Sequence, residues 1–161
     1  MNEVIITNWN NRVKPEDIVF HNGDFCFKNS AGGKAGEGML HKAIYYTNKL
    51  NGSIIFTKGN HDRNNSVKTI IDKIVIKYGP HYINITHVPE HYDSNFSINF
   101  VGHIHEKWKF KRLYIPEYDR YIDLINIGVD VWQFRPVTFE EIYNGYRSWV
   151  KGMKKKDVQF I

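Results

Sequence analysis

Three stretches of this 161-residue sequence repeat one pattern, in which an apolar run that favours a β-strand is followed by a glycine and then by polar side chains. The stretches read "IVFHNGD", "IIFTKGNHD" and "INFVGHIH", and a fourth run, "YINITH", ends in a histidine without the glycine. Ligands of open α/β sheets bind at the carboxyl ends of the strands, so the pattern predicts that these polar groups meet in one crevice. The glycines would let the chain turn sharply and approach a small ligand closely.

Helix-like and strand-like stretches alternate along the chain. Apolar spacing predicts helices over 3–12, 39–50, 66–74 and 138–152. It predicts strands over 17–24, 53–60, 82–88, 97–105 and 124–132, and the glycines indicate a loop over 28–38. Thr138 and Glu141 have the spacing of a capping box, which supports the last helix.

This order of elements predicts a layered α/β fold whose first part is parallel and whose last part is antiparallel. The length suits one domain over residues 1–161, and we expect the lysine-rich end over 154–161 to be a solvated, partly ordered tail.

Composition narrows the class of protein. Hydrophobic residues make up 42% and charged residues 24%, and no apolar run approaches the roughly 20 residues of a membrane helix. The first residues lack a secretory signal, so we expect a soluble cytoplasmic protein with no membrane partner. Cys26 is the one cysteine, which excludes an internal disulfide, and we expect it to be a small buried hydrophobe. The net charge of +5 favours anionic partners only weakly.

The polar groups at the strand ends have the chemistry of a metal site. Aspartate, asparagine and histidine suit Zn, Mn, Fe or Ni better than the all-oxygen site that Ca prefers. His103 and His105 are two residues apart, so a strand would point both side chains to one side. For the other strand-end and surface histidines a structural role is favoured; they are His21, His41, His81 and His91.

The blocks "HNGDF", "IIFTKGNHDR", "ITHVPE", "FVGHIHEKW" and "INIGVDVW" occur in an order that resembles the calcineurin-like metallophosphoesterases, in particular small bacterial and phage-type members. The resemblance covers nearly the whole chain. It implies an α/β/β/α sandwich with mixed sheets and a centre of two metal ions that hydrolyses phosphate esters.

The resemblance also implies a role for each matching residue. Asp24 would bridge the two metals, and His105 would bind the second one. The remaining ligands of the first metal would be Asn60, His87 and His103.

Beside the metals, the resemblance places three residues near the substrate. His61 would act as a general acid toward the leaving group, a contribution of roughly two to four orders of magnitude in rate. Asp62 would orient the imidazole of His61, and Arg63 would contact phosphate oxygens.

One block of the family is missing, because no Asp-x-His occurs in the sequence. The resemblance implies that this block lies at the end of a first strand and supplies two ligands of the second metal. Its loss predicts an exposed strand edge, uncovered apolar surface and a single retained metal. Three explanations stay open: a truncated product, a misplaced start, and a gap that another subunit fills. His91 and Asp93 are disfavoured as replacement ligands, because nothing in their spacing recommends them.

Two functions follow. The first is a metal-dependent phosphoesterase, a hydrolase that acts on phosphomonoesters or phosphodiesters with metal-activated water and His61. The second is an inactive module on the same scaffold that binds phosphate or nucleic acid. The sequence leaves the substrate open among nucleotides, nucleic acids, proteins and small molecules.

Overall fold

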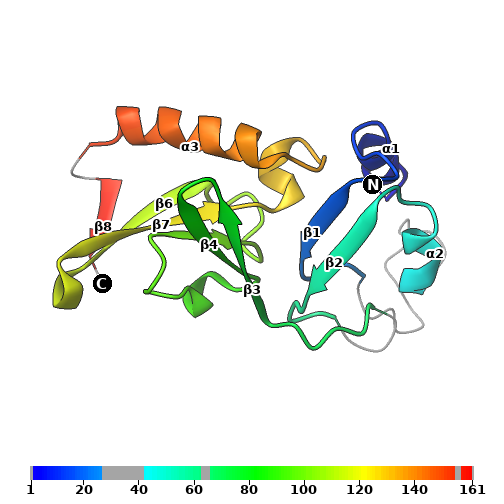
Figure 1. Ribbon diagram of the computed structural model, residues 1–161, viewed down its shortest axis with the longest axis horizontal. Helices are drawn as coiled ribbons and strands as arrows, with labels where there is room; N and C mark the ends of the chain where they lie inside the picture. Colours follow the sequence, from blue (N-terminus) through cyan, green and yellow to red (C-terminus); the bar gives the residue numbers. More distant parts are fainter. Residues whose placement is uncertain (1, 27–41, 63–65, 155–156, 161) are drawn as a thin grey trace.

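The computed structural model of the chain describes residues 2–26, 42–62, 66–154 and 157–160. It is a mixed α/β fold with a two-stranded sheet and a six-stranded sheet (Figure 1). None of the helices in these residues is long and apolar enough to cross a membrane. The glycine-rich loop expected over 28–38 lies outside the described residues.

The smaller sheet comes from the first third of the chain. Its two strands pair in parallel, from Ile18 opposite Ser53 to Asn22 opposite Thr57. In Figure 1 this sheet lies at one end of the molecule, and its first strand is the one nearer the larger sheet. The elements of this part are α1 (Asn2–Asn10), β1 (Ile18–Asn22), α2 (Ala43–Thr47) and β2 (Ser53–Thr57).

The larger sheet has the strand order β3-β4-β5-β7-β6-β8. The β3–β4 and β6–β7 pairs are antiparallel and the other three pairs are parallel, so the sheet is mixed. Helix α3 (Phe139–Gly152) runs along one face (Figure 1). The strands are β3 (Lys73–Tyr78), β4 (His81–Thr86), β5 (Ile98–Val101), β6 (Phe110–Ile115), β7 (Arg120–Asn126) and β8 (Val158–Phe160).

Both faces of the larger sheet carry apolar clusters. Ile125 of β7 belongs to the cluster that includes Ile142 of α3, whereas Ile122 and Leu124 belong to a second cluster. Strands that are buried on both faces have consecutive apolar residues rather than alternating apolar and polar ones. This explains why Leu124 and Ile125, adjacent in β7, are both apolar and buried. The core therefore lies on both sides of β5 and β7, the strands at the centre of this sheet.

The prediction of a helix over 66–74 is wrong. Residues 66–72 form no helix or strand, and β3 begins at Lys73. Ile70 is 95% exposed, so it belongs to no apolar helix face, whereas Ile76 packs against the core beneath α3. β-branched residues favour strands, and pairing with β4 outweighs the helical spacing.

The end of the chain also differs from expectation. Instead of a solvated tail, Val158–Phe160 forms β8, which pairs in parallel with β6. β6 itself was not predicted. Because β6 pairs antiparallel with β7 and parallel with β8, the final part of the fold is mixed rather than purely antiparallel. The strand expected over 124–132 ends at Asn126 and continues into a 3₁₀ turn that buries Trp132.

The capping box of α3 is confirmed. The backbone amide of Glu141 donates to the Thr138 hydroxyl at 3.2 Å, and the Glu141 carboxylate accepts from the Thr138 amide at 2.9 Å. The Glu141 carboxylate also binds Arg12 at 2.5 Å and Arg135 at 2.9 Å. One side chain thus starts α3 and ties it to the segment that follows α1.

A candidate metal centre

The turns that follow β1 and β2 contact each other through two glycines. Gly23 has φ +78°, and a Cβ on it would lie 2.6 Å from Nδ1 of His87 and 2.7 Å from Cα of Gly59. A Cβ on Gly59 would lie 2.2 Å from the amide nitrogen of Asp24. The expected need for glycine holds at these two positions. At Gly102 a Cβ would meet only ordinary contacts at 3.5 Å.

Asp62 fastens the same two turns together. Its carboxylate accepts hydrogen bonds from the amides of Asp24 and Gly59, both at 2.8 Å, from the amide of Phe25 at 3.0 Å and from the hydroxyl of Ser66. The expectation that Asp62 orients the imidazole of His61 stays a prediction, and these hydrogen bonds give Asp62 a second role. Both of its oxygens already accept from backbone amides, so its position organises the turns.

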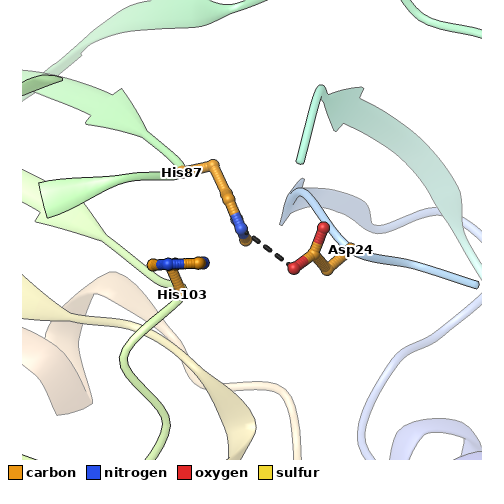
Figure 2. A group of neighbouring side chains, drawn as sticks. All are labelled: Asp24, His87 and His103. Atoms are coloured by element: carbon orange, nitrogen blue, oxygen red, sulfur yellow. Dashed lines mark ion pairs between the residues drawn. The ribbon is translucent and has the colours of Figure 1, made fainter. Parts of the chain in front are cut away.

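Asp24, His87 and His103 converge from the ends of β1, β4 and β5 (Figure 2). One potential ligand atom from each of these side chains lies within 4.8 Å of the others. The Oδ2 atom of Asp24 is 3.0 Å from Nε2 of His87, and Oδ1 of Asn60 is also 3.0 Å from that nitrogen. The four residues predicted for the first metal therefore lie together.

A hydrogen bond to the backbone sets the orientation of the His87 ring. Its Nδ1 lies 2.7 Å from the carbonyl oxygen of Asn22, which can only accept, so Nδ1 carries the proton. This leaves Nε2 directed at Asp24, the arrangement that metal-binding histidines commonly have. The Asn22 side chain is itself fixed, because its Nδ2 donates to the carbonyl of Thr86 and its Oδ1 accepts from Thr57.

The pair formed by Asp24 and His87 has perturbed pKa values. Burial alone would lower the pKa of His87, but its hydrogen bonds to Asp24 and to the Asn22 carbonyl outweigh burial and raise it. Burial would raise the pKa of Asp24, but the contact with His87 and the amide of His61 lower it. The contacts thus favour a charged pair in the absence of a cation.

Two residues of the three-residue cluster have a strained backbone. Six non-glycine residues of the described chain have positive φ, and they include Asp24 at 54°, His103 at 68° and His105 at 51°. Such conformations cost energy and persist where the surrounding structure enforces them, often at functional sites. The expectation that His103 and His105 share one side of a strand fails, because β5 ends at Val101.

His105 lies outside the three-residue cluster. It is exposed, and its Nδ1 is 3.2 Å from a carboxylate oxygen of Asp130. His61 is exposed as well, and its backbone amide donates to Oδ1 of Asp24 at 2.8 Å, which places it beside the cluster. Arg63 lies outside the described residues.

Sequence reasoning missed the residues that support the ligands. Asn22 precedes the first glycine turn, and Asn126 donates to the carbonyls of His105 at 2.7 Å and Trp108 at 2.9 Å. Asn126 is buried and Asn22 is half-buried. Each lies at the end of an apolar strand, an unusual place for asparagine that could have marked both residues in the sequence. Cys26 is buried, as expected.

The donor set fits a divalent transition metal. It combines a carboxylate, two imidazoles and an amide oxygen, which are ligands that Zn, Mn, Fe and Ni accept. His103 is exposed whereas His87 is 4% exposed, so the set has a buried side and a side open to solvent.

Comparison with known proteins places the chain in a family. Over 146 residues it is 32% identical to "Uncharacterized protein MJ1445" of Methanocaldococcus jannaschii, a match that covers 88% of this chain and 73% of the archaeal protein. The chain therefore belongs to the same family as that protein. No model of a protein family matches it.

A solved structure shares the fold. The protein of unknown function AQ665 from Aquifex aeolicus superposes with a TM-score of 0.60 over 89% of this chain and 83% of that chain, at 24% sequence identity. The names of these two proteins state no activity.

Proposed function

We propose that this chain is a calcineurin-like metallophosphoesterase, a metal-dependent hydrolase of phosphomonoesters or phosphodiesters. The observation that carries the proposal is the convergence of Asp24, His87 and His103 from three separate strands, with Asn60 beside them. The α/β/β/α sandwich of that family agrees with α3 along one sheet and with α1 and α2 beside the other (Figure 1).

Asp24, Asn60, His87 and His103 would hold the metal. A divalent cation in this position supplies charge stabilisation to phosphoryl oxygens and lowers the pKa of a bound water. The protein contributes a pre-oriented donor set. His87 is held by the Asn22 carbonyl, and Asp24 is held by the amide of His61, so neither needs to reorganise on binding.

His61 is the residue best placed to donate a proton to the leaving oxygen. Its backbone is bound to Asp24, and its exposed side chain lies on the turn that borders the ligand cluster. Asp62 acts on this step indirectly, by fixing the turn that carries His61. The net charge of +5 agrees with an anionic substrate such as a nucleotide.

A second function, a binding module without catalysis, is favoured by one observation. His105, the remaining family ligand in the sequence, is 3.2 Å from Asp130 rather than within the three-residue cluster. A centre with one metal would then bind a phosphate group without the second cation that stabilises the attacking and leaving oxygens in two-metal sites.

The test is hydrolysis of bis(p-nitrophenyl) phosphate with added Mn²⁺, measured together with Mn²⁺ affinity. We compare the unmodified chain with His61→Ala, His87→Ala and the control His91→Ala, an exposed histidine outside the cluster. His87→Ala should lose Mn²⁺ binding and activity together. His61→Ala should keep Mn²⁺ affinity and lose roughly two to four orders of magnitude in kcat.

The outcomes separate the two functions. Tight Mn²⁺ binding without hydrolysis supports the binding module. Absence of Mn²⁺ binding by a folded chain contradicts both functions, and an unchanged kcat in His61→Ala contradicts the assigned acid.

A further inference from the structure

Two cations, Lys109 and Arg135, lie at the edge of the larger sheet that carries the candidate metal centre. β4, β5 and β7 are parallel, so their carboxyl ends share this edge. β6 runs antiparallel to β7 and begins at the same edge, directly after Lys109. Arg135 lies beyond the 3₁₀ turn that follows β7, and it lines the same cavity as Asp24 and His103.

Asn126 connects Lys109 to the loop of His105. Its Nδ2 donates to the carbonyl of His105 at 2.7 Å, and its backbone amide donates to the carbonyl of Lys109 at 2.9 Å. Its own carbonyl accepts from the indole nitrogen of Trp132 at 2.8 Å. One buried asparagine thus fixes Lys109 and Trp132 close to the last histidine of the family pattern.

The ammonium group of Lys109 is held by an aromatic ring and not by a carboxylate. Its Nζ lies 3.4 Å from the centroid of the buried Trp132 ring. The described residues give this Nζ neither an ion pair nor a hydrogen bond. A cation–π contact attracts the ammonium group, but it leaves N–H donors for another acceptor.

Arg135 is fixed in place with part of its guanidinium group unused. Its Nη1 donates to Glu141 at 2.9 Å and its Nε to Gln133 at 3.4 Å, whereas its Nη2 has no acceptor within the described chain. Gln133 and Phe134 have φ values of 60° and 53°. Such strained residues persist where the surrounding structure enforces them, so the turn that carries Arg135 has a defined shape.

Positive charge exceeds negative charge around these two side chains. Glu141 binds both Arg12 and Arg135, so one carboxylate serves two guanidinium groups. Burial and the positive charge of Arg135 lower the pKa of Lys109. A bound anion would offset this repulsion, and phosphate oxygens are strong acceptors for lysine and arginine donors.

We propose that Lys109 and Arg135 form a subsite for a second phosphate group of the substrate, beside the phosphate group at the metal centre. The substrate class is then a molecule with at least two phosphate groups, such as a nucleoside diphosphate or a short oligonucleotide. The assignment of this group to a substrate rests on the proposed function, whereas the anion subsite itself requires no metal.

The first test measures the subsite without metal. Inorganic pyrophosphate is titrated in metal-free buffer, and the indole N–H signal of Trp132 is followed by NMR. We compare the unmodified chain with Lys109→Met, which keeps an unbranched side chain over the ring but removes the charge. Lys109→Arg restores the charge, and Lys107→Met is the matched control, because Lys107 is an exposed lysine two residues away.

Pyrophosphate should shift the Trp132 signal of the unmodified chain and of Lys107→Met with the same dissociation constant. Lys109→Met should bind about tenfold more weakly, the scale of one lost charge-assisted hydrogen bond, and Lys109→Arg should regain most of the affinity. No shift at millimolar pyrophosphate, or equal affinity in Lys109→Met, would overturn the proposal.

The second test measures the substrate class. AMP, ADP and a 5′-phosphorylated dithymidylate are compared as inhibitors of the Mn²⁺-dependent hydrolysis of bis(p-nitrophenyl) phosphate. Lys109→Met should weaken a two-phosphate inhibitor about tenfold and leave AMP unchanged. A loss for ADP alone identifies adjacent phosphates, and a loss for the dinucleotide alone identifies a nucleic-acid backbone.

The remaining outcomes separate the subsite from the proposed function. An equal loss for AMP would show general attraction of anions and overturn a subsite for the second phosphate. Pyrophosphate binding that depends on Lys109, in a chain that hydrolyses no phosphate ester with Mn²⁺, would support the anion subsite and contradict its assignment to a substrate.

Discussion

His87 joins more parts of the candidate site than its neighbours do. One ring nitrogen contacts the Asn22 carbonyl and the other contacts Asp24 and Asn60, so one imidazole connects the ends of β1, β2 and β4. Because the Asn22 carbonyl keeps the proton on Nδ1, the fold rather than a bound ion sets the tautomer of His87.

His21 is the residue whose titration should limit acid stability. Burial lowers its pKa from 6.5 to about 4, so the folded chain favours the neutral ring. The resulting stability is fully present above pH 6.5 and is lost as the pH falls toward 4, by up to about 3 kcal/mol. Urea denaturation of the unmodified chain and of His21→Phe, each in EDTA from pH 7.5 to 4.5, measures this loss.

The difference in stability between the two chains should move in favour of His21→Phe as the pH falls. A constant difference across this range would contradict the role of His21. Phenylalanine is a suitable replacement, because the ring already packs against Phe25 and Phe56 at centroid distances of 5.0 and 5.5 Å.

Asp62→Ala should lower stability and Mn²⁺ affinity together. It removes the acceptor of three backbone amides at the turns that carry Asp24 and His61, and each donor left unsatisfied costs roughly 1–3 kcal/mol. Denaturation and calorimetric titration with Mn²⁺ measure the two effects. Asp72→Ala, an exposed carboxylate, is the control. Normal stability with a loss of kcat alone would instead favour the predicted role of Asp62 in orienting His61.

The meeting of Asp24, Asn60, His87 and His103 was predictable from sequence, because each follows an apolar strand and strand ends share one edge. The role of Asp62 was not predictable. It depends on the contact between the turns at Gly23 and Gly59, which only the packed sheets determine. The separation of His105 likewise follows from where β5 ends.

At the scale of elements, α3 is held by the side chain that also caps it. Thr138→Ala should cost about 1 kcal/mol, the usual value of a lost cap. Glu141→Ala should cost more, because it removes the other half of the capping box, the acceptor of the Thr138 amide, and also leaves Arg12 and Arg135 without this carboxylate. Urea denaturation of these variants, with the exposed Glu140→Ala as control, checks the order. Equal costs for Thr138→Ala and Glu141→Ala would mean that the two ion pairs add nothing.

In segment 66–74, pairing between strands outweighs the local apolar pattern. Val67, Ile70, Ile71 and Ile74 have helical spacing, yet β3 forms because it pairs with β4 through a two-residue turn at Gly79 and Pro80. Gly79 has φ +57°, which suits such a turn, so the glycine was a local signal for a hairpin. β8 had no comparable signal, since a three-residue strand exists only through its pairing with β6.

At the scale of the whole molecule, Phe139 connects the two sheets. Its ring lies 6.3 Å from Phe20 of β1, 5.1 Å from Tyr78 of β3 and 5.9 Å from Phe100 of β5, centroid to centroid. Phe139→Ala should cost about 2–3 kcal/mol, below the 3–5 of a fully buried phenylalanine, because the side chain is only partly buried.

Hydrogen exchange should show that β1 and β2 of this variant open more often than β5 and β7. The matched control is Tyr118→Ala, which removes an aromatic ring that is 56% exposed. Uniform destabilisation of both sheets would mean that Phe139 stabilises a single cooperative core rather than the contact between the sheets.

The ligands of the candidate centre come from both sheets, since Asp24 follows β1 whereas His87 and His103 follow β4 and β5. In the proposed function, the free concentration of metal would therefore enter the thermodynamics of folding. A cation that binds only the assembled arrangement adds about 2.7 kcal/mol of stability at one hundred times its dissociation constant. For a chain of this length that is a rise in melting temperature of roughly 5–10 °C. Chelation would then loosen the joint between the sheets, so metal supply would govern the lifetime of the folded protein as well as its chemistry.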